Sequence, residues 1–392
     1  MKKSMFIAAI ATMVLAGCTK DESIVEQQEI GFQPLAYKAS QTKANVITGA
    51  TYGIKDPEFG LFAYQLADGK TFDADKDEAK LYIDNKRVHY DSGNWRTDPK
   101  SFWPLQGSLT FVAYSPYSIN QDVDYNIRVV NDNAGNVASA NSVLTISDFE
   151  AGTTGQKDLM WSTHTKDKTA NGNIGDNIVD NITQEYNGVP ILFKHALCRI
   201  KITAKTAEDY SGFATYKLKQ IQVVGLKDNA TLTVTDDNAQ WTAPTVNLGT
   251  AITVDNATKY AFNFFAPASE TKYIELNSMN SNLVNYDNEE KDAQGAYREI
   301  GLLAIPQSLD GVTLEVTYTM TVDPNDQVDD DEVVTETTKV VTLFKDDVLE
   351  TLEQNKVYTL NLSISANEIL YSPDVIAWDE TGSGDYTVPE VQ

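Results

Sequence analysis

The chain has 392 residues, of which 42% are apolar and 10% aromatic, so it has the composition of a folded protein with length for about two or three domains. Two domains are expected. The formal net charge of −25 at pH 7 argues against nucleic acid and anionic membrane surfaces as electrostatic partners.

The first element is predicted to be a secretion signal. Lys2 and Lys3 precede a short apolar run over residues 5–14, which is too short to span a bilayer as a mature helix. Residues 15–18, Leu-Ala-Gly-Cys, resemble the lipobox of bacterial lipoproteins. We therefore predict a lipoprotein signal peptide over residues 1–17 and an acylated Cys18. The alternative is an ordinary secretory signal with an accidental cysteine.

The residues after the lipobox indicate an address at the cell surface. Lys20 is followed by two acidic residues, and this short stretch resembles the surface-export signal of Bacteroidetes lipoproteins.

With Cys18 assigned to lipid, Cys198 has no cysteine partner, and no intrachain disulfide can form. The fold must therefore be stabilised by packing.

A propeptide or tether is predicted over residues 18–44. It is mostly polar, but residues 30–37 alternate roughly like a strand. The following residues, 38–45, are small and polar and include Lys38 and Lys43, as expected of an exposed, protease-accessible segment. The alternative is a solvated linker with no processing role.

The first folded part is predicted over residues 45–192. Its apolar runs are short and separated by Gly, Asn and Asp clusters, as in the strands of a sandwich or barrel. The connections over residues 120–142 and 162–188 are long, and long loops are either functional or mobile. The runs are residues 59–64, 81–83, 109–114 and 143–146.

The second folded part is predicted over residues 193–392. In residues 198–205, Cys198, Ile200 and Ile202 share one strand face and basic or polar residues the other, so Cys198 is predicted to be buried. Residues 312–320 and 358–364 alternate in the same way, which favours half-buried antiparallel strands. One short helix is expected over residues 346–354.

The sequence contains no pattern of a catalytic or cofactor site. The chain has three histidines, His89, His164 and His195, none in a metal or triad spacing, and His195 is predicted to be structural. No glycine-rich loop opens a helix after a strand, which argues against nucleotide chemistry. We therefore expect no enzyme, no cofactor and no metal site.

Acidic loops and tryptophans are the remaining candidates for binding. Asp73, Asp75 and Asp77 match the first ligand positions of a calcium loop, but Glu78 replaces the required glycine. Solvated loops are the better interpretation of this segment and of residues 323–332. Likewise Trp95, Trp103 and Trp161 are expected in the core rather than on a sugar-binding platform.

Several segments taken in order resemble the fimbrillins of Bacteroidales, specifically the Mfa-like fimbrial lipoproteins, over nearly the whole chain. The resemblance implies an all-β fold of two tandem transthyretin-like, Greek-key β-sandwich domains with few short helices, divided at residues 192 and 193. It rests on the lipobox, residues 30–32, 59–64, 103–104, 109–116, 158–160, 189–200, 303–307 and 356–360, and residues 375–378.

The resemblance also implies a mechanism of assembly. A lipidated precursor reaches the outer membrane, an Arg- or Lys-specific protease removes an N-terminal segment with its strand, and a strand of the next subunit fills the resulting groove. In this chain Cys18 corresponds to the lipid site and Lys43 to the cleavage site, with Lys38 second. The expected partners are other fimbrial subunits, the outer membrane before processing, and host or bacterial surface ligands.

Two alternatives stay open at this point. The chain is either a pilin, stalk or tip, that supports adhesion, or a monomeric outer-membrane surface lipoprotein that binds glycans or host protein through its loops. A possible short C-terminal strand at residues 386–391 contains Pro389, which restricts it to a sheet edge. A donated strand there would indicate a stalk subunit.

Overall fold

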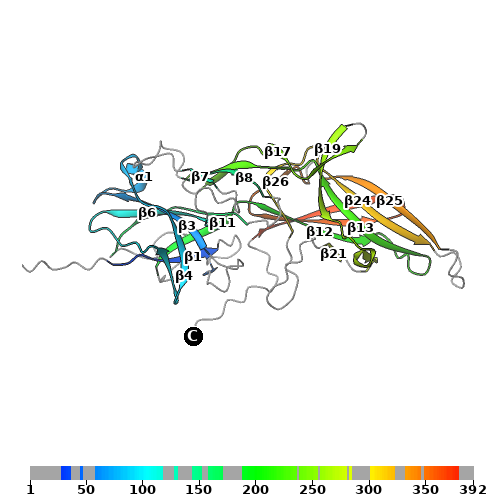
Figure 1. Ribbon diagram of the computed structural model, residues 1–392, viewed down its shortest axis with the longest axis horizontal. Helices are drawn as coiled ribbons and strands as arrows, with labels where there is room; N and C mark the ends of the chain where they lie inside the picture. The colour runs from blue at the N-terminus through cyan, green and yellow to red at the C-terminus, as the bar shows by residue number, and fades with distance from the viewer. Residues whose placement is uncertain are drawn as a thin grey trace, which may run out of the picture.

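The computed structural model is elongated, with the N-terminal strands at one end and the C-terminal strands at the other (Figure 1). It describes residues 28–36, 45–46, 58–117, 128–130, 144–151, 158–170, 188–235, 238–254, 257–279, 282–284, 301–322, 332–345 and 348–378. Cys18, Lys38, Lys43 and the predicted strand at residues 386–391 lie outside these ranges.

The described chain is all-β, as the sequence predicts. Its helical segments are one turn of α-helix, α1 (Phe72–Asp75), and two 3₁₀ turns, η1 (Lys76–Glu78) and η2 (Glu270–Lys272). None of the helices in the described ranges has the length and apolar composition needed to cross a bilayer.

The first sheet closes into a ring. Its order is β10-β6-β3-β4-β5-β1-β11-β9, β2 (Asn45–Val46) pairs with β1, and β9 pairs back onto β6. A core of apolar side chains fills the ring, with residues from β1, β3, β4, β5, β6 and β11. The strands are β1 (Gly31–Ala36), β3 (Glu58–Leu66), β4 (Lys80–Asp91), β5 (Asn94–Asp98), β6 (Ser108–Ser115), β9 (Met160–Ser162), β10 (Thr165–Lys168) and β11 (Val189–His195).

Strands β3 and β6 are buried on both faces, which explains their uninterrupted apolar sequences. Phe59 and Leu61 point into the ring, whereas Phe62 and Tyr64 belong to a second core outside it. That second core is covered by a sheet of order β16-β15-β8-β7. Its strands are β7 (Arg128–Val130), β8 (Leu144–Phe149), β15 (Ala230–Thr235) and β16 (Asn238–Trp241).

The C-terminal part is a sandwich of two sheets around a third core. One has the order β21-β12-β27-β28, with β22 on β12, and the other β18-β19-β13-β24-β25, with β20 on β13. The first contains β12 (Cys198–Thr206), β21 (Asn282–Val284), β22 (Leu302–Ala304), β27 (Lys356–Ile364) and β28 (Ile369–Ala377). The second contains β13 (Ala214–Val224), β18 (Thr250–Val254), β19 (Ala257–Phe265), β20 (Ile274–Leu276), β24 (Thr313–Val322) and β25 (Val333–Thr342).

Two small strand pairs complete the described fold. They are β14 (Lys227–Asp228) with β17 (Val246–Asn247), and β23 (Gln307–Ser308) with β26 (Thr351–Leu352). The helix predicted over residues 346–354 is wrong, because the described part of this segment, residues 348–354, holds a turn and β26. Leu349 and Leu352 are buried and Val348 is exposed, so the apolar spacing reflects a turn rather than a helix face.

The predicted division at residues 192 and 193 falls inside β11. Across this point, β8 pairs antiparallel with β15, and the second core takes side chains from both parts of the chain. Pairing and packing therefore continue through the middle of the molecule. The two-domain division and the transthyretin-like topology stay predictions.

The alternation of residues 198–205 is confirmed, because Cys198, Ile200, Ile202 and Ala204 all lie in the C-terminal core. The Cys198 thiol is fully buried and donates a hydrogen bond to the Ala304 carbonyl oxygen over 3.2 Å. Burial raises the pKa of this thiol because the thiolate would lose its hydration.

Cys198 is therefore expected to resist alkylation in the folded protein. Iodoacetamide at pH 8 should leave it unmodified in native Cys18→Ser chain and modify it fully in guanidinium chloride, because the reactive thiolate forms only after exposure. Mass spectrometry of tryptic peptides measures both. Rapid alkylation under native conditions would contradict the buried position.

Candidate functional site: the slot that holds strand β1

The strand-like block at residues 30–37 is a strand within the first sheet. β1 runs parallel to β11 over five residue pairs, from Phe32 opposite Val189 to Ala36 opposite Phe193. On its other side it runs antiparallel to β5 at Gly31 and Phe32, and then to β2 at Leu35 and Ala36. We call the space between β5 and β11 that β1 fills the β1 slot.

Phe32 fixes β1 in the slot by packing into the core of the ring. It is 2% exposed, and its ring lies 5.8 Å from that of Phe111 and 6.5 Å from that of Phe59, both edge to face. Phe59 also contacts Phe193 of β11. Edge-to-face pairs add to the free energy gained by burying the rings. Phe32 therefore makes β1 part of the core inside the ring.

The segment before β1 is held as well. The Ile30 amide donates to the Ser101 carbonyl oxygen over 2.9 Å, and the Trp103 amide donates to the Gln28 carbonyl oxygen over 2.9 Å. Lys100 Nζ pairs with Glu29 Oε2 at 2.7 Å. The exposed ion pair adds little to stability, whereas the backbone bonds extend the anchoring of β1 toward its N-terminal side.

Pro34 makes β1 unusual for an interior strand. Proline has no backbone N–H and is normally restricted to sheet edges, strand starts and bulges. Here Pro34 stands opposite Ile191 of β11, beyond the two residues of β1 that pair with β5. The lip of the slot at β5 therefore holds β1 over a shorter length than the lip at β11 does.

Gly188, immediately before β11, allows β1 to approach. Its φ is +141°, and a Cβ built there would lie 2.7 Å from the carbonyl carbon of Gly31 and 2.8 Å from the amide nitrogen of Phe32. A side chain at position 188 would therefore collide with the backbone of β1. No pattern in the sequence predicts that Gly188 forms a wall of the slot.

The predicted cleavage residues lie in the sequence between β1 and β2. β1 and β2 are antiparallel neighbours, with Leu35 opposite Val46 and Ala36 opposite Asn45. Residues 37–44, which connect them, include both Lys38 and Lys43. A cut in this connection would separate β1 from the rest of the chain.

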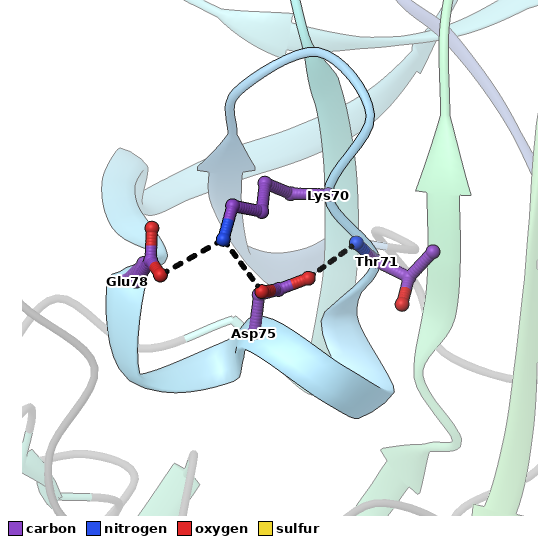
Figure 2. A network of polar contacts seen from close by, with 4 residues as sticks. All are labelled: Lys70, Thr71, Asp75 and Glu78. Carbon is purple, nitrogen blue, oxygen red and sulfur yellow. Dashed lines mark hydrogen bonds and ion pairs between the residues drawn. The ribbon is translucent and has the colours of Figure 1, made fainter.

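In the acidic segment at residues 73–78, the carboxylates of Asp75 and Glu78 point to Lys70 (Figure 2). Lys70 Nζ lies 2.8 Å from Asp75 Oδ1 and 3.0 Å from Glu78 Oε1, and Asp75 also accepts from the Thr71 amide. The hydrogen bond from Lys70 lowers the pKa of Asp75. Across the described ranges, no three His, Cys, Asp or Glu side chains gather closely enough to hold a metal ion.

The predicted core tryptophans are confirmed as core residues. Trp95, Trp103 and Trp161 are 3%, 5% and 2% exposed, so none of them offers a ring face for a sugar. His195 bonds Asp158 through Nδ1, 2.8 Å from Oδ2, and stacks on Trp378 at a centroid distance of 4.2 Å. These contacts support the structural role that the sequence assigns to His195.

Comparisons with known proteins find one matching family and several similar structures. A sequence profile described as fimbrillin-like matches residues 42–378. A fimbrial protein from Bacteroides vulgatus has a similar structure, with a TM-score of 0.56, 20% identity, and coverage of 90% of this chain and 99% of that one. This likeness shows a shared fold. No curated protein is similar enough in sequence to count as a match.

Two further solved structures are less similar. A candidate cell adhesion protein from Bacteroides uniformis gives a TM-score of 0.46 at 14% identity, covering 89% of this chain and 98% of that one. The fimbrial anchor protein Mfa2 from Porphyromonas gingivalis gives 0.31 at 11% identity, covering 90% and 98%.

Phe32→Ala is expected to lower the free energy of unfolding of the uncleaved chain by about 3–5 kcal/mol, because it leaves a cavity among aromatic rings. Gln33→Ala in the same strand is the matched control and should cost about 1 kcal/mol or less, since Gln33 is only half-buried. Urea denaturation measures both. Equal losses would contradict the central position of Phe32.

Gly188→Ala should destabilise the uncleaved chain more than Gly69→Ala does. Both glycines have positive φ, but a Cβ at Gly69 meets nothing within 4 Å, so that variant reports backbone strain alone, about 1–2 kcal/mol. The excess at position 188 combines the collision with β1 and the difference in backbone strain between a φ of +141° and one of +78°. Urea midpoints that fall equally in the two variants would contradict the close approach.

Proposed function

The chain belongs to the fimbrillin-like family, and from this premise we propose that it is a structural subunit of a cell-surface fimbria, held inactive for assembly by its own β1. The observation that carries the proposal is the position of β1 between β5 and β11, with Phe32 in the core. A strand that completes the sheet blocks the site where a neighbour would add its own.

Loss of β1 would create a receptor for another strand. The edge of β11 would lose its partner over five residue pairs, and β5 would lose its partner at Trp95 and Arg96. The rings of Phe59 and Phe111 would lose their contact with Phe32 of β1. Unpaired backbone groups beside an apolar floor favour an extended strand with alternating large side chains.

Cleavage at Lys43 would release β1 and the lipid together. Both Cys18 and β1 precede Lys43, whereas β2 follows it. A single cut would therefore separate the lipidated Cys18 and β1 from the rest of the folded chain. The mature chain would begin at Ala44. Before the cut, acylated Cys18 would hold the precursor at the outer membrane, and an uncut subunit would remain there as an anchor.

We expect a Lys43→Ala variant to accumulate as a lipidated precursor and to form no polymer, because β1 stays covalently attached. Lys38→Ala is the matched control and should be processed normally. Mass spectrometry of the mature N-terminus and a gel of unheated sample measure processing and assembly. The natural chain should give a terminus at Ala44 and a ladder of bands.

Recovery of the natural chain with an intact acylated Cys18, and no species beginning near Ala44, would contradict the processing step. A fully processed chain that stays monomeric would contradict assembly. A monomer that also shows saturable binding to glycans or host protein would instead support the surface-binding lipoprotein.

A further inference from the structure

Strand β25 forms a long free edge that is separate from the β1 slot. It ends the sheet order β18-β19-β13-β24-β25 on the C-terminal half of the molecule (Figure 1). Its register with β24 runs without a bulge from Val322 opposite Val333 to Thr313 opposite Thr342. Within the described ranges, no strand pairs with its opposite edge.

This edge lacks most of the features that keep sheet edges apart. Natural edge strands are protected by prolines, bulges, short length or several charges. β25 has ten residues, no proline and one residue of each charge, Glu336 and Lys339. Its side chains Val333, Val334 and Val340 are 57%, 60% and 61% exposed. A regular, valine-rich edge of this kind is suited to pairing with another strand.

The sequence of β25 indicates which strand it fits. Residues 333–341 read Val-Val-Thr-Glu-Thr-Thr-Lys-Val-Val, with a pair of valines at equal distance on each side of Thr337. Two copies related by a two-fold axis perpendicular to the sheet pair antiparallel, and such an axis keeps each side chain on its own face. One residue must then stand opposite itself, since strand side chains alternate with a period of two.

We propose that β25 pairs with β25 of a second copy of this chain, antiparallel and centred on Thr337. Val334 then stands opposite Val340 of the other copy, and Val333 opposite Val341, each twice by symmetry. Cross-strand valine pairs stabilise a sheet through side-chain contact. The pairing joins two subunits side by side. It does not involve the β1 slot, so it is independent of strand exchange.

The charges of β25 are compatible with this register. Glu336 faces Thr338 of the other copy and Lys339 faces Thr335, so no like charges stand directly opposite. The Glu336 side chains of the two copies stand diagonal to each other. In each subunit, however, Lys219 of β13 forms an ion pair with Glu336, which offsets their repulsion. Moving the centre to Thr338 would place Glu336 opposite Val340, which disfavours that alternative.

The register is tested with single cysteines in full-length Cys18→Ser chain, in which Cys198 is buried. Val334→Cys and Val340→Cys proteins are oxidised separately and as an equal mixture, then run on a non-reducing gel. The mixture should give a disulfide dimer, because the two thiols face each other. Each variant alone should not, since its own thiols are offset by six residues, about 20 Å.

An equal mixture of Val246→Cys and Val348→Cys, two exposed valines outside β25, measures crosslinking by random collision. The proposal predicts at least a tenfold greater dimer yield from the β25 mixture. Equal yields from the two mixtures, or dimers from Val334→Cys alone, would overturn it. Because β1 is present in every sample, the result does not depend on processing at Lys43.

A second measurement needs no crosslink. The double variant Val334→Lys with Val340→Lys should lower the dimer fraction in sedimentation equilibrium at least tenfold, since lysines on an edge oppose strand addition. At protein concentrations low enough for the parent chain to be monomeric, the thermal midpoints of variant and parent should match, because both positions are exposed. An unchanged dimer fraction would overturn the proposal, as would a parent chain that is monomeric throughout.

Discussion

The position of β1 between β5 and β11 is the contact on which the N-terminal half depends. The ring of pairings from β6 through β3, β4, β5, β1, β11 and β9 back to β6 is closed only while β1 is in place. A closed sheet has no edges. The same strand contributes Phe32 to the core, so backbone pairing and side-chain packing at this place are a single constraint.

The two lips of the slot hold β1 unequally. β11 pairs with it over five residues, whereas β5 pairs with Gly31 and Phe32 at the N-terminal end of the strand. The C-terminal end, at Leu35 and Ala36, is held on that side by β2. Under the proposed function, a cut before β2 removes the covalent tie at the end that β5 does not reach.

The sequence predicts those elements whose burial follows from local alternation. Cys198 to Ala204 alternate because one face of β12 meets the core, and Leu360 and Leu362 of β27 do so for the same reason. β3 and β6 lack alternation because both of their faces are covered. The expected helix failed because Val348, Leu349 and Leu352 have helical spacing in a segment that in fact turns and pairs as β26.

Only one part of the candidate site, the strand β1, could be predicted from the sequence. The block at residues 30–37 is recognisable as a strand, but its partner β11 lies more than 150 residues away, and nothing local encodes parallel pairing over that separation. The wall at Gly188 is equally hidden, since a glycine in sequence does not reveal what its missing Cβ would meet. Ring closure depends on β9, a strand of three residues whose pairing is set by the rest of the sheet.

Under the proposed function, the two edges of this protein differ in when they become available. The edges of β5 and β11 are paired while β1 is in place, whereas the edge of β25 is free of partners among the described residues from the start. The net charge of −25 opposes non-specific association between copies. At physiological ionic strength this electrostatic repulsion is screened over about 8 Å. Only surfaces that match at short range can overcome this repulsion. The matched valines around Thr337 meet that condition, so an always-exposed edge can be selective without being covered.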